Sequence, residues 1–250
     1  MNRAALSGLF VLLLCTLFPL NAAKDPFSYP LSTVILDAGH GGRDPGTSAS
    51  YSFAGGTINE SDLTLDITKR VLALLAIENP ALNLVMTRQD DSYVSLAERC
   101  RIAYATELSP QSSVLFVSIH INSAQAREAS GFEILTKQQG KRVTFLDEQT
   151  PIRNIPLFAP FTALELNRLL NQRNLFVAKT FEEALSQRML TSRNRGIKER
   201  DLYVLNASRV PSVLLELGFL SNEDEARNIV SPAWRQQVAN AITEAVLSCM

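Results

Sequence analysis

The chain contains only two histidines, and each follows an apolar segment that predicts a β-strand. His40 comes shortly after residues 33–37 (TVILD), and His120 directly follows residues 114–119 (VLFVSI). Ligands of open α/β sheets bind beyond the carboxyl ends of the strands, so both imidazoles are expected at one rim of a sheet. Zinc hydrolases commonly hold the metal with two histidines and one carboxylate and leave the fourth position to water. The two histidines therefore predict part of a zinc site that still lacks a third ligand.

Glu60 is the candidate for that third ligand. It lies at the start of a predicted helix, residues 59–76, and follows the glycine-rich loop that begins at His40. Asp62 is a rival from the same helical turn. An acid in the first turn also stabilises a helix through its dipole, and Asp62 fits that ordinary role better. We therefore expect Glu60 to lie beside the histidines.

Glu216 stands out because it interrupts the apolar run of residues 213–220 (VLLELGFL). Burying a carboxylate is costly unless the group is paired or has a function. Two interpretations follow. Glu216 forms a buried salt bridge with an arginine, or it is a general base with a raised pKa at the end of a strand.

An α/β fold must position these side chains, because apolar runs alternate with amphipathic helical patterns along the chain. The pattern predicts one domain with helices packed on a sheet and an irregular insertion at about 138–173. The predicted strands are residues 33–37, 82–87, 114–119, 131–135, 202–205 and 212–217. The predicted helices are residues 59–76, a helix capped by Ser95 with Leu96, Cys100 and Ala103 inward, a patch at 163–170, residues 175–189, and a last helix opened by Ser231-Pro232.

Composition and the first residues indicate where the protein acts. The 250 residues carry a formal net charge of −1, which argues against a nucleic-acid partner. Residues 1–23 are typical of a signal peptide, with Arg3, an apolar core and small residues before the cleavage site; an uncleaved anchor is the alternative. We expect an exported, periplasmic protein of residues 24–250 with no stable membrane span. Its two cysteines, Cys100 and Cys249, could pair or remain buried thiols.

Several motifs together resemble the zinc-dependent N-acetylmuramoyl-L-alanine amidases, which cleave bacterial peptidoglycan. The opening motif is similar to residues 36–46 (LDAGHGGRDPG), and Asn59-Glu60 falls where the family places its glutamate ligand. Further similarities are residues 86–88 (MTR), 96–99 (LAER), 117–122 (VSIHIN) and 215–222 (LELGFLSN). The resemblance covers almost all of residues 24–250 and implies a twisted, mostly parallel sheet flanked by helices on both faces.

The resemblance also implies residue roles. His40, Glu60 and His120 would hold one zinc ion, and Glu216 would be the catalytic carboxylate. The bond cleaved would be the amide between the muramic acid lactyl group and L-alanine of the stem peptide. Two weaker assignments are Asn122, which would steady the loop or touch substrate, and Arg88, a structural ion-pair partner more than a catalyst. A related amidase or peptidase acting on another amide, or a catalytically silent peptidoglycan-binding module, are the alternatives.

Two segments depart from the family pattern. The loop of residues 46–60 is longer than usual, which leaves Glu60 less secure than the histidines, and the insertion at 138–173 exceeds the family minimum. In some relatives an inserted helix covers the zinc until a partner protein withdraws it. Here residues 162–170 could be such a helix, with Glu165 on the metal and an activator protein acting on the insertion. We slightly favour the other reading, in which the insertion extends a wall of the substrate groove.

Overall fold

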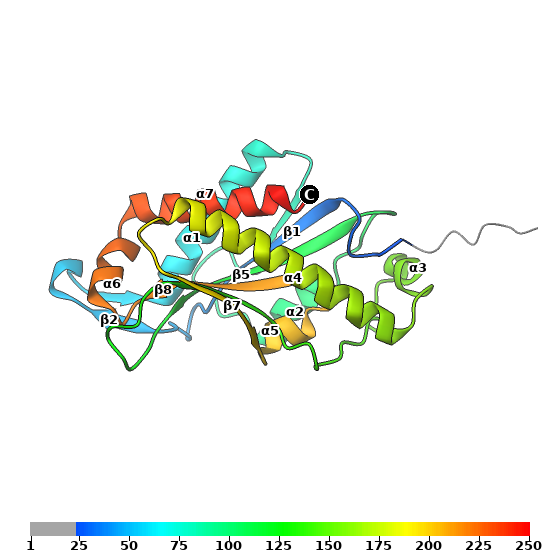
Figure 1. Ribbon diagram of the computed structural model, residues 1–250, viewed down its shortest axis with the longest axis horizontal. Helices are drawn as coiled ribbons and strands as arrows, with labels where there is room; N and C mark the ends of the chain where they lie inside the picture. Colours follow the sequence, from blue (N-terminus) through cyan, green and yellow to red (C-terminus); the bar gives the residue numbers. More distant parts are fainter. Residues whose placement is uncertain (1–23) are drawn as a thin grey trace, which may run out of the picture.

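The computed structural model describes residues 24–250, so the predicted signal peptide, residues 1–23, lies outside the described residues. A six-stranded sheet with the order β4-β1-β5-β8-β6-β7 forms its centre (Figure 1). Neighbouring strands are parallel except for β6 and β8, which are antiparallel. The strands are β1 (Leu31–Ala38), β4 (Asn83–Met86), β5 (Ser113–Asn122), β6 (Phe132–Lys137), β7 (Asn194–Arg200) and β8 (Ser212–Phe219).

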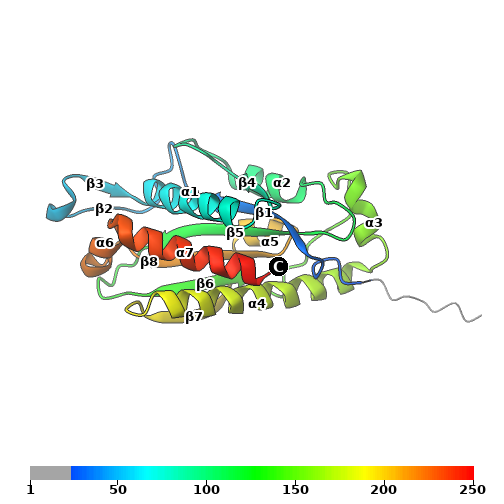
Figure 2. The same ribbon diagram turned by 90° about the horizontal axis from the view of Figure 1, so that it is seen from above.

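Helices pack on both faces of this sheet, which confirms the expected single α/β domain. In Figure 1, α1 and α7 lie above the sheet, and α2 and α5 lie below it. Figure 2 looks onto the first face, where α1, α7 and α4 run side by side. The seven helices of the described residues are α1 (Glu60–Glu78), α2 (Leu96–Tyr104), α3 (Ile155–Phe158), α4 (Ala163–Arg188), α5 (Tyr203–Ala207), α6 (Glu223–Ile229) and α7 (Pro232–Ser248).

The middle residues of the central strands β1, β5 and β8 are mostly apolar because both faces of these strands are covered. In β1, Val34 and Leu36 belong to the core under α1, α4 and α7, whereas Ile35 belongs to the core under α2 and α5. Successive side chains of a strand point to opposite faces, so one short run supplies both cores. This arrangement leaves the carboxyl ends of β1 and β5 as the places where polar side chains begin.

Four local expectations differ from the structure. Residues 202–205 are not a strand, because helix α5 begins at Tyr203. Strand β7 was not predicted, because its sequence, NRGIKER, is mostly polar, as suits a strand at the edge of the sheet. Helix α4 is continuous from 163 to 188 rather than two separate pieces. Leu96, expected inward, is 54% exposed.

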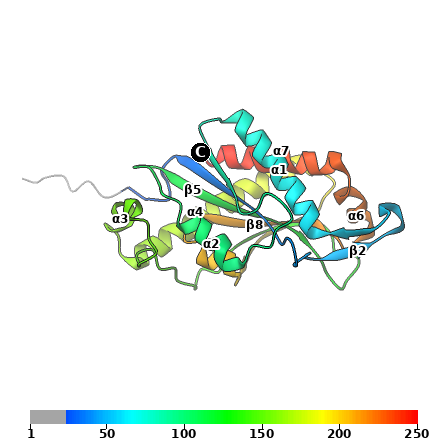
Figure 3. The same cartoon turned by 180° about the vertical axis from the view of Figure 1, so that it is seen from behind.

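A small hairpin also went unpredicted within the long loop of residues 46–60. Strands β2 (Ser48–Ser50) and β3 (Thr57–Asn59) pair antiparallel, with a single 3₁₀ turn at Ser52–Ala54 between them. Figure 3 shows this hairpin projecting past α6. The Tyr51 hydroxyl donates to the carbonyl oxygen of Leu220 (2.9 Å), which ties the hairpin to the end of β8.

The insertion at 138–173 packs at the amino ends of the central strands. Asn154 bonds the backbone of Thr106 and Leu108, which precede β5. The apolar side chains of the insertion form a separate small core together with Phe27. They are Val143, Phe145, Phe158, Leu166 and Leu170. Within residues 24–250, none of the helices combines the length and apolarity that crossing a membrane requires.

Candidate metal centre

Three side chains from separate segments meet beyond the carboxyl ends of β1 and β5. His40 follows β1, His120 lies two residues before the end of β5, and Glu60 is the first residue of α1. One Glu60 oxygen, Oε2, lies 3.1 Å from His40 Nε2, and the other, Oε1, lies 3.0 Å from His120 Nδ1. One ligand atom from each residue lies within 4.8 Å of the other two. Asp62 is exposed and outside this group.

Backbone donors fix the Glu60 carboxylate in addition to the histidines. Thr47 N donates to Oε2 and Ile121 N donates to Oε1, each at 3.0 Å. Burial disfavours the charged form of Glu60, but the hydrogen bonds and charges of His120 and His40 outweigh it and lower the pKa of Glu60. The Glu60 carboxylate is therefore ionised and already oriented.

Asp44 was not anticipated as part of this group. Its Oδ2 lies 2.9 Å from His40 Nδ1, which leaves His40 Nε2 facing Glu60. Carboxylates that hold the outer nitrogen of a ligating histidine fix its ring orientation. Burial opposes protonation of His40, but Glu60 and Asp44 outweigh it and raise the pKa of His40 to about 8. The signal in the sequence was an acid four residues after a histidine in a glycine-rich loop.

Two glycines make this close packing possible. A Cβ atom on Gly39 would lie 2.4 Å from His120 Cε1, and one on Gly46 would lie 2.6 Å from Glu60 Oε2. Gly46 also has a φ of +67°, a conformation that favours glycine. The glycines of the opening motif therefore leave room for the ligand side chains.

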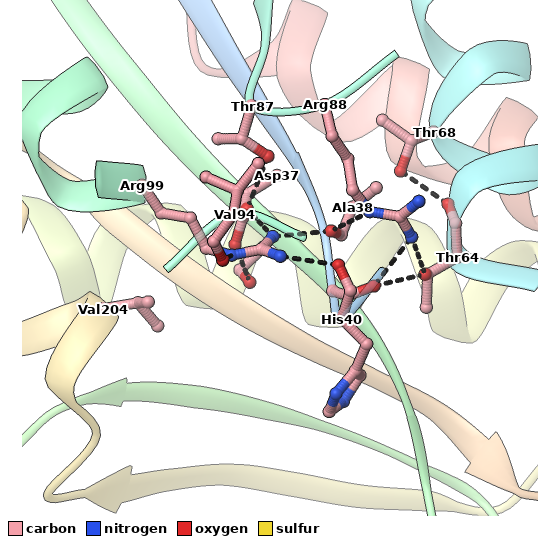
Figure 4. A network of polar contacts seen from close by, with 12 residues as sticks. Asp37, Ala38, His40, Thr64, Thr68, Thr87, Arg88, Val94, Arg99 and Val204 are labelled. Atoms are coloured by element: carbon pink, nitrogen blue, oxygen red, sulfur yellow. Dashed lines mark hydrogen bonds and ion pairs between the residues drawn. The ribbon is translucent and has the colours of Figure 1, made fainter. Parts of the chain in front are cut away.

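Two buried arginines hold the loop that carries His40 (Figure 4). Arg99 Nη1 lies 2.5 Å from Asp37 Oδ1, and its Nη2 donates to the carbonyl oxygen of His40 at 2.6 Å. Arg88 donates to the carbonyl oxygens of Ala38 and Gly39. Arg88 thus supports the backbone, as expected of a structural residue, but it makes no ion pair with any described residue.

Glu216 lies beside the three-residue group, on the strand next to His120. The two residues are in register across β5 and β8. Glu216 Oε2 is buried and accepts no hydrogen bond from the described residues, and no arginine of residues 24–250 forms a salt bridge with it. Burial is the main cause that raises the pKa of Glu216 to about 7. A carboxylate in this state can accept and release a proton near neutral pH.

Two further polar side chains, Asn122 and Glu133, lie close to Glu216. Asn122 Nδ2 donates to Glu133 Oε1 at 3.1 Å, and Glu133 is in register with Glu216 on the other side of β8. Glu133 also forms ion pairs with Arg195 and Lys198. The sequence analysis missed Glu133, although an acid in the apolar segment GFEIL is the same kind of anomaly as Glu216.

A pocket of about 180 Å³ opens beside the two histidines. Three exposed apolar side chains, Tyr93, Leu96 and Tyr203, stand along its wall. No residue of the insertion lines it. The Glu165 carboxylate instead accepts hydrogen bonds from the backbone N and the hydroxyl of Thr162, its own helix cap, so the structure does not bring Glu165 to the histidines.

The donor set fits a zinc ion. Two imidazoles and one carboxylate are the protein ligands of many catalytic zinc sites. The ring nitrogens and carboxylate oxygens already converge, and Asp44 supplies the outer hydrogen bond. The unpartnered Oε2 of Glu216 lies in the same row of side chains and provides a proton acceptor.

Comparisons with known proteins point to one family. The Amidase_3 family, N-acetylmuramoyl-L-alanine amidase, matches residues 34–248. YqiI, an uncharacterised protein of Bacillus subtilis, is 32% identical over 92% of this chain and 90% of its own length. The probable N-acetylmuramoyl-L-alanine amidase AmiB of Haemophilus influenzae is 28% identical over 89% of this chain. The chain spans about half of AmiB, 52%.

Solved structures agree with this result. The N-acetylmuramoyl-L-alanine amidase AmiC2 of Nostoc punctiforme superposes with a TM-score of 0.64 at 28% identity, covering 86% of this chain and 95% of AmiC2. The CwlD amidase of Clostridioides difficile, solved in complex with the GerS lipoprotein, has a TM-score of 0.62 at 25% identity. That match covers 87% of this chain and 98% of CwlD.

Proposed function

Because the chain belongs to the N-acetylmuramoyl-L-alanine amidase family, and is thus a cell-wall amidase, we propose that it is an exported, zinc-dependent enzyme. Its substrate is peptidoglycan, and the bond it hydrolyses joins the muramic acid lactyl group to L-alanine of the stem peptide. The observation that carries the proposal is the convergence of His40, Glu60 and His120 beside the unpartnered carboxylate of Glu216.

His40, Glu60 and His120 hold the zinc ion in this proposal. When bound, zinc supplies Lewis-acid polarisation of the amide carbonyl and makes water a better nucleophile at neutral pH. The protein contributes preorganised ligands. Asp44 fixes the ring of His40, and the amides of Thr47 and Ile121 fix the carboxylate of Glu60.

Glu216 moves the protons of the reaction. It accepts a proton from the attacking water and passes it to the nitrogen of L-alanine as the C–N bond breaks, so that a carboxylate and an amine leave. Its raised pKa, about 7, suits both steps near neutral pH. The apolar wall of Tyr93, Leu96 and Tyr203 gives the substrate a surface next to the reacting amide.

Digestion of purified sacculi tests the proposal directly. Residues 24–250 are incubated with sacculi, with and without a zinc chelator, and the products are analysed by mass spectrometry. We expect peptides with a free L-alanine amino terminus, lost on chelation and restored by zinc. Other zinc-dependent fragments would favour an amidase or peptidase acting on another amide. A folded, zinc-loaded protein that releases nothing would favour a binding module.

Export and a partner protein belong to the same proposal. The signal-peptide pattern of residues 1–23 supports export, with the periplasm as the expected destination. An activator protein acting on the insertion at 138–173 is supported by exposed Ile152 and Leu164 and by the CwlD relative, which was solved with a lipoprotein. Since Glu165 bonds its own helix cap, a Glu165→Gln variant should hydrolyse sacculi at the unchanged basal rate. A marked rise in that rate would instead indicate that Glu165 restrains the site.

A further inference from the structure

A row of charged side chains crosses the sheet away from the candidate metal centre. His120 on β5, Glu216 on β8 and Glu133 on β6 are direct neighbours in register. Neighbours in register point to the same face of a sheet. On β7, Lys198 is in register with Leu135 of β6. Leu135 and Glu133 lie on the same face of the sheet because one residue of β6 separates them. Lys198 therefore ends the row that begins at His120.

Both oxygens of Glu133 already accept hydrogen bonds from side chains of the protein. Oε1 accepts from Asn122, and Oε2 receives both Arg195 Nε, at 3.1 Å, and the Lys198 ammonium group. Two cations thus share one carboxylate oxygen, and no second carboxylate of residues 24–250 forms an ion pair with either of them. Burial raises the pKa of Glu225, and the charge of Arg195 opposes that rise, so Arg195 also interacts with a second acid.

Lys198 is the cation with spare hydrogen-bonding capacity. An ammonium group has three N–H donors, and Glu133 is its one acceptor within residues 24–250. Its side chain is 27% exposed, so it is open to solvent and to a ligand. The remaining donors suit a second carboxylate, because charge-assisted hydrogen bonds are among the stronger ones.

The spacing suits a peptide that leaves the metal centre along this row. Adjacent strands are about 4.8 Å apart, so Glu133 stands roughly 10 Å from His120 measured across the sheet. An extended peptide advances about 3.3–3.6 Å per residue. With its scissile amide between the histidines and Glu216, a peptide places its second or third residue near Lys198.

We propose, on the basis of the amidase function above, that Lys198 determines substrate specificity by binding a free carboxylate of the stem peptide, one or two residues beyond L-alanine. Glu133 positions the ammonium group, and Asn122 holds Glu133. The site would favour peptides with an acidic group at this point over amidated ones.

Two substrates that differ by one group test this role. Both are synthetic N-acetylmuramoyl tripeptides that begin with L-alanine and whose second residue is joined to the third through its side-chain carboxyl group. The free α-carboxyl of that second residue is a carboxylate in one substrate and a carboxamide in the other. The zinc-loaded protein and its Lys198→Gln and Lys198→Arg variants are compared by kcat/KM. Lys141→Gln is the matched control, since Lys141 also forms an ion pair, with Asp201, but is exposed and outside the row.

We expect the unaltered protein and Lys141→Gln to prefer the carboxylate substrate about tenfold, the effect of one charge-assisted contact. Lys198→Gln should remove the preference by slowing cleavage of the carboxylate substrate alone, and Lys198→Arg should retain much of it. An equal preference in the unaltered protein and Lys198→Gln would overturn the role of Lys198 while leaving the amidase function intact. Cleavage of neither substrate would overturn both.

Discussion

Glu60 contacts two histidines through different oxygens of one carboxylate: Oε2 faces His40 Nε2 at 3.1 Å, and Oε1 faces His120 Nδ1 at 3.0 Å. Because the carboxylate lies between the imidazoles, it links the end of β1 to the end of β5. The same atoms that a metal would need are already drawn together by charge and hydrogen bonding. The contrast with Asp62, two residues along the same helix and exposed, makes the role of Glu60 testable.

Zinc binding should stabilise the fold through Glu60. Zinc at 100 times its dissociation constant should add about 2.7 kcal/mol to the free energy of unfolding and raise the melting temperature of metal-stripped protein. Glu60→Gln should reduce this shift strongly, because it removes the anionic ligand, whereas Asp62→Asn should preserve it. Calorimetry with and without zinc measures both. Loss of the shift in Asp62→Asn alone would reverse the assignment.

Glu216→Gln should lower the rate of sacculus hydrolysis by about 10²–10⁴-fold, the usual contribution of a general base. Zinc content, measured by elemental analysis, should remain at one ion per chain because Glu216 is not one of the three converging ligands. Glu223→Gln, which changes an exposed acid paired with Arg227 on α6, serves as the control. Near-normal activity of Glu216→Gln would show that Glu216 is not the proton acceptor.

The stability of the metal-free protein should depend on pH through Glu216. Its pKa is raised from 4.5 to about 7, so between these values the folded protein binds more protons than the unfolded chain. The contribution of Glu216 to the free energy of unfolding is fully present below pH 4.5. It falls by about 3 kcal/mol as the pH rises to about 7. Urea denaturation in the presence of a chelator should therefore find Glu216→Gln gaining stability, relative to the unaltered protein, from pH 4.5 to 7.5. A difference that stays constant with pH would contradict the shift.

Arg99 should contribute far more to stability than its neighbour Arg101. Arg99→Met leaves the buried carboxylate of Asp37 without its ion pair, which typically costs about 3–5 kcal/mol. Arg101→Met breaks only an exposed pair with Glu98 and should cost well below 1 kcal/mol. Urea midpoints of the two variants decide the point. Similar losses in both would mean that the Asp37–Arg99 contact is not important for the fold.

The two cysteines of residues 24–250 should be unreactive in the folded protein. Cys100 and Cys249 are free and buried, in cores on opposite faces of the sheet, and burial raises their pKa values to about 12 and about 11. A thiol reagent should label neither in residues 24–250 under native conditions and both in denaturant. Failure to label in denaturant, reversed by a reductant, would reveal a disulfide.

The main features of the site could be predicted because they depend on one rule, that parallel strands bring their carboxyl ends to the same edge. This rule placed His40 and His120 together, and the helix start placed Glu60 beside them. The pairing of the strands could not be predicted from the sequence. The polar strand β7 has no apolar pattern to reveal it, and the antiparallel register of β6 that sets Glu133 beside Glu216 is not encoded in any local motif.

Short apolar runs were the other source of error. Residues 202–205 (LYVL) fit a buried strand or one turn of helix equally well, since four residues are too few to show a period. The sequence predicted two helical pieces in place of α4 because the middle of this helix, around Asn171 to Asn174, is polar. The continuous helix packs on β6 and α7.

Helix α1 also separates the candidate metal centre from the last residue, Met250. Its 19 residues span about 28 Å, with Glu60 at one end and Asn79 just beyond the other. Met250 Sδ lies 3.2 Å from Asn79 Nδ2. A fluorescent protein, affinity tag or solid support attached after Met250 would therefore stand a helix length away from the pocket, with access to large, insoluble sacculi left open.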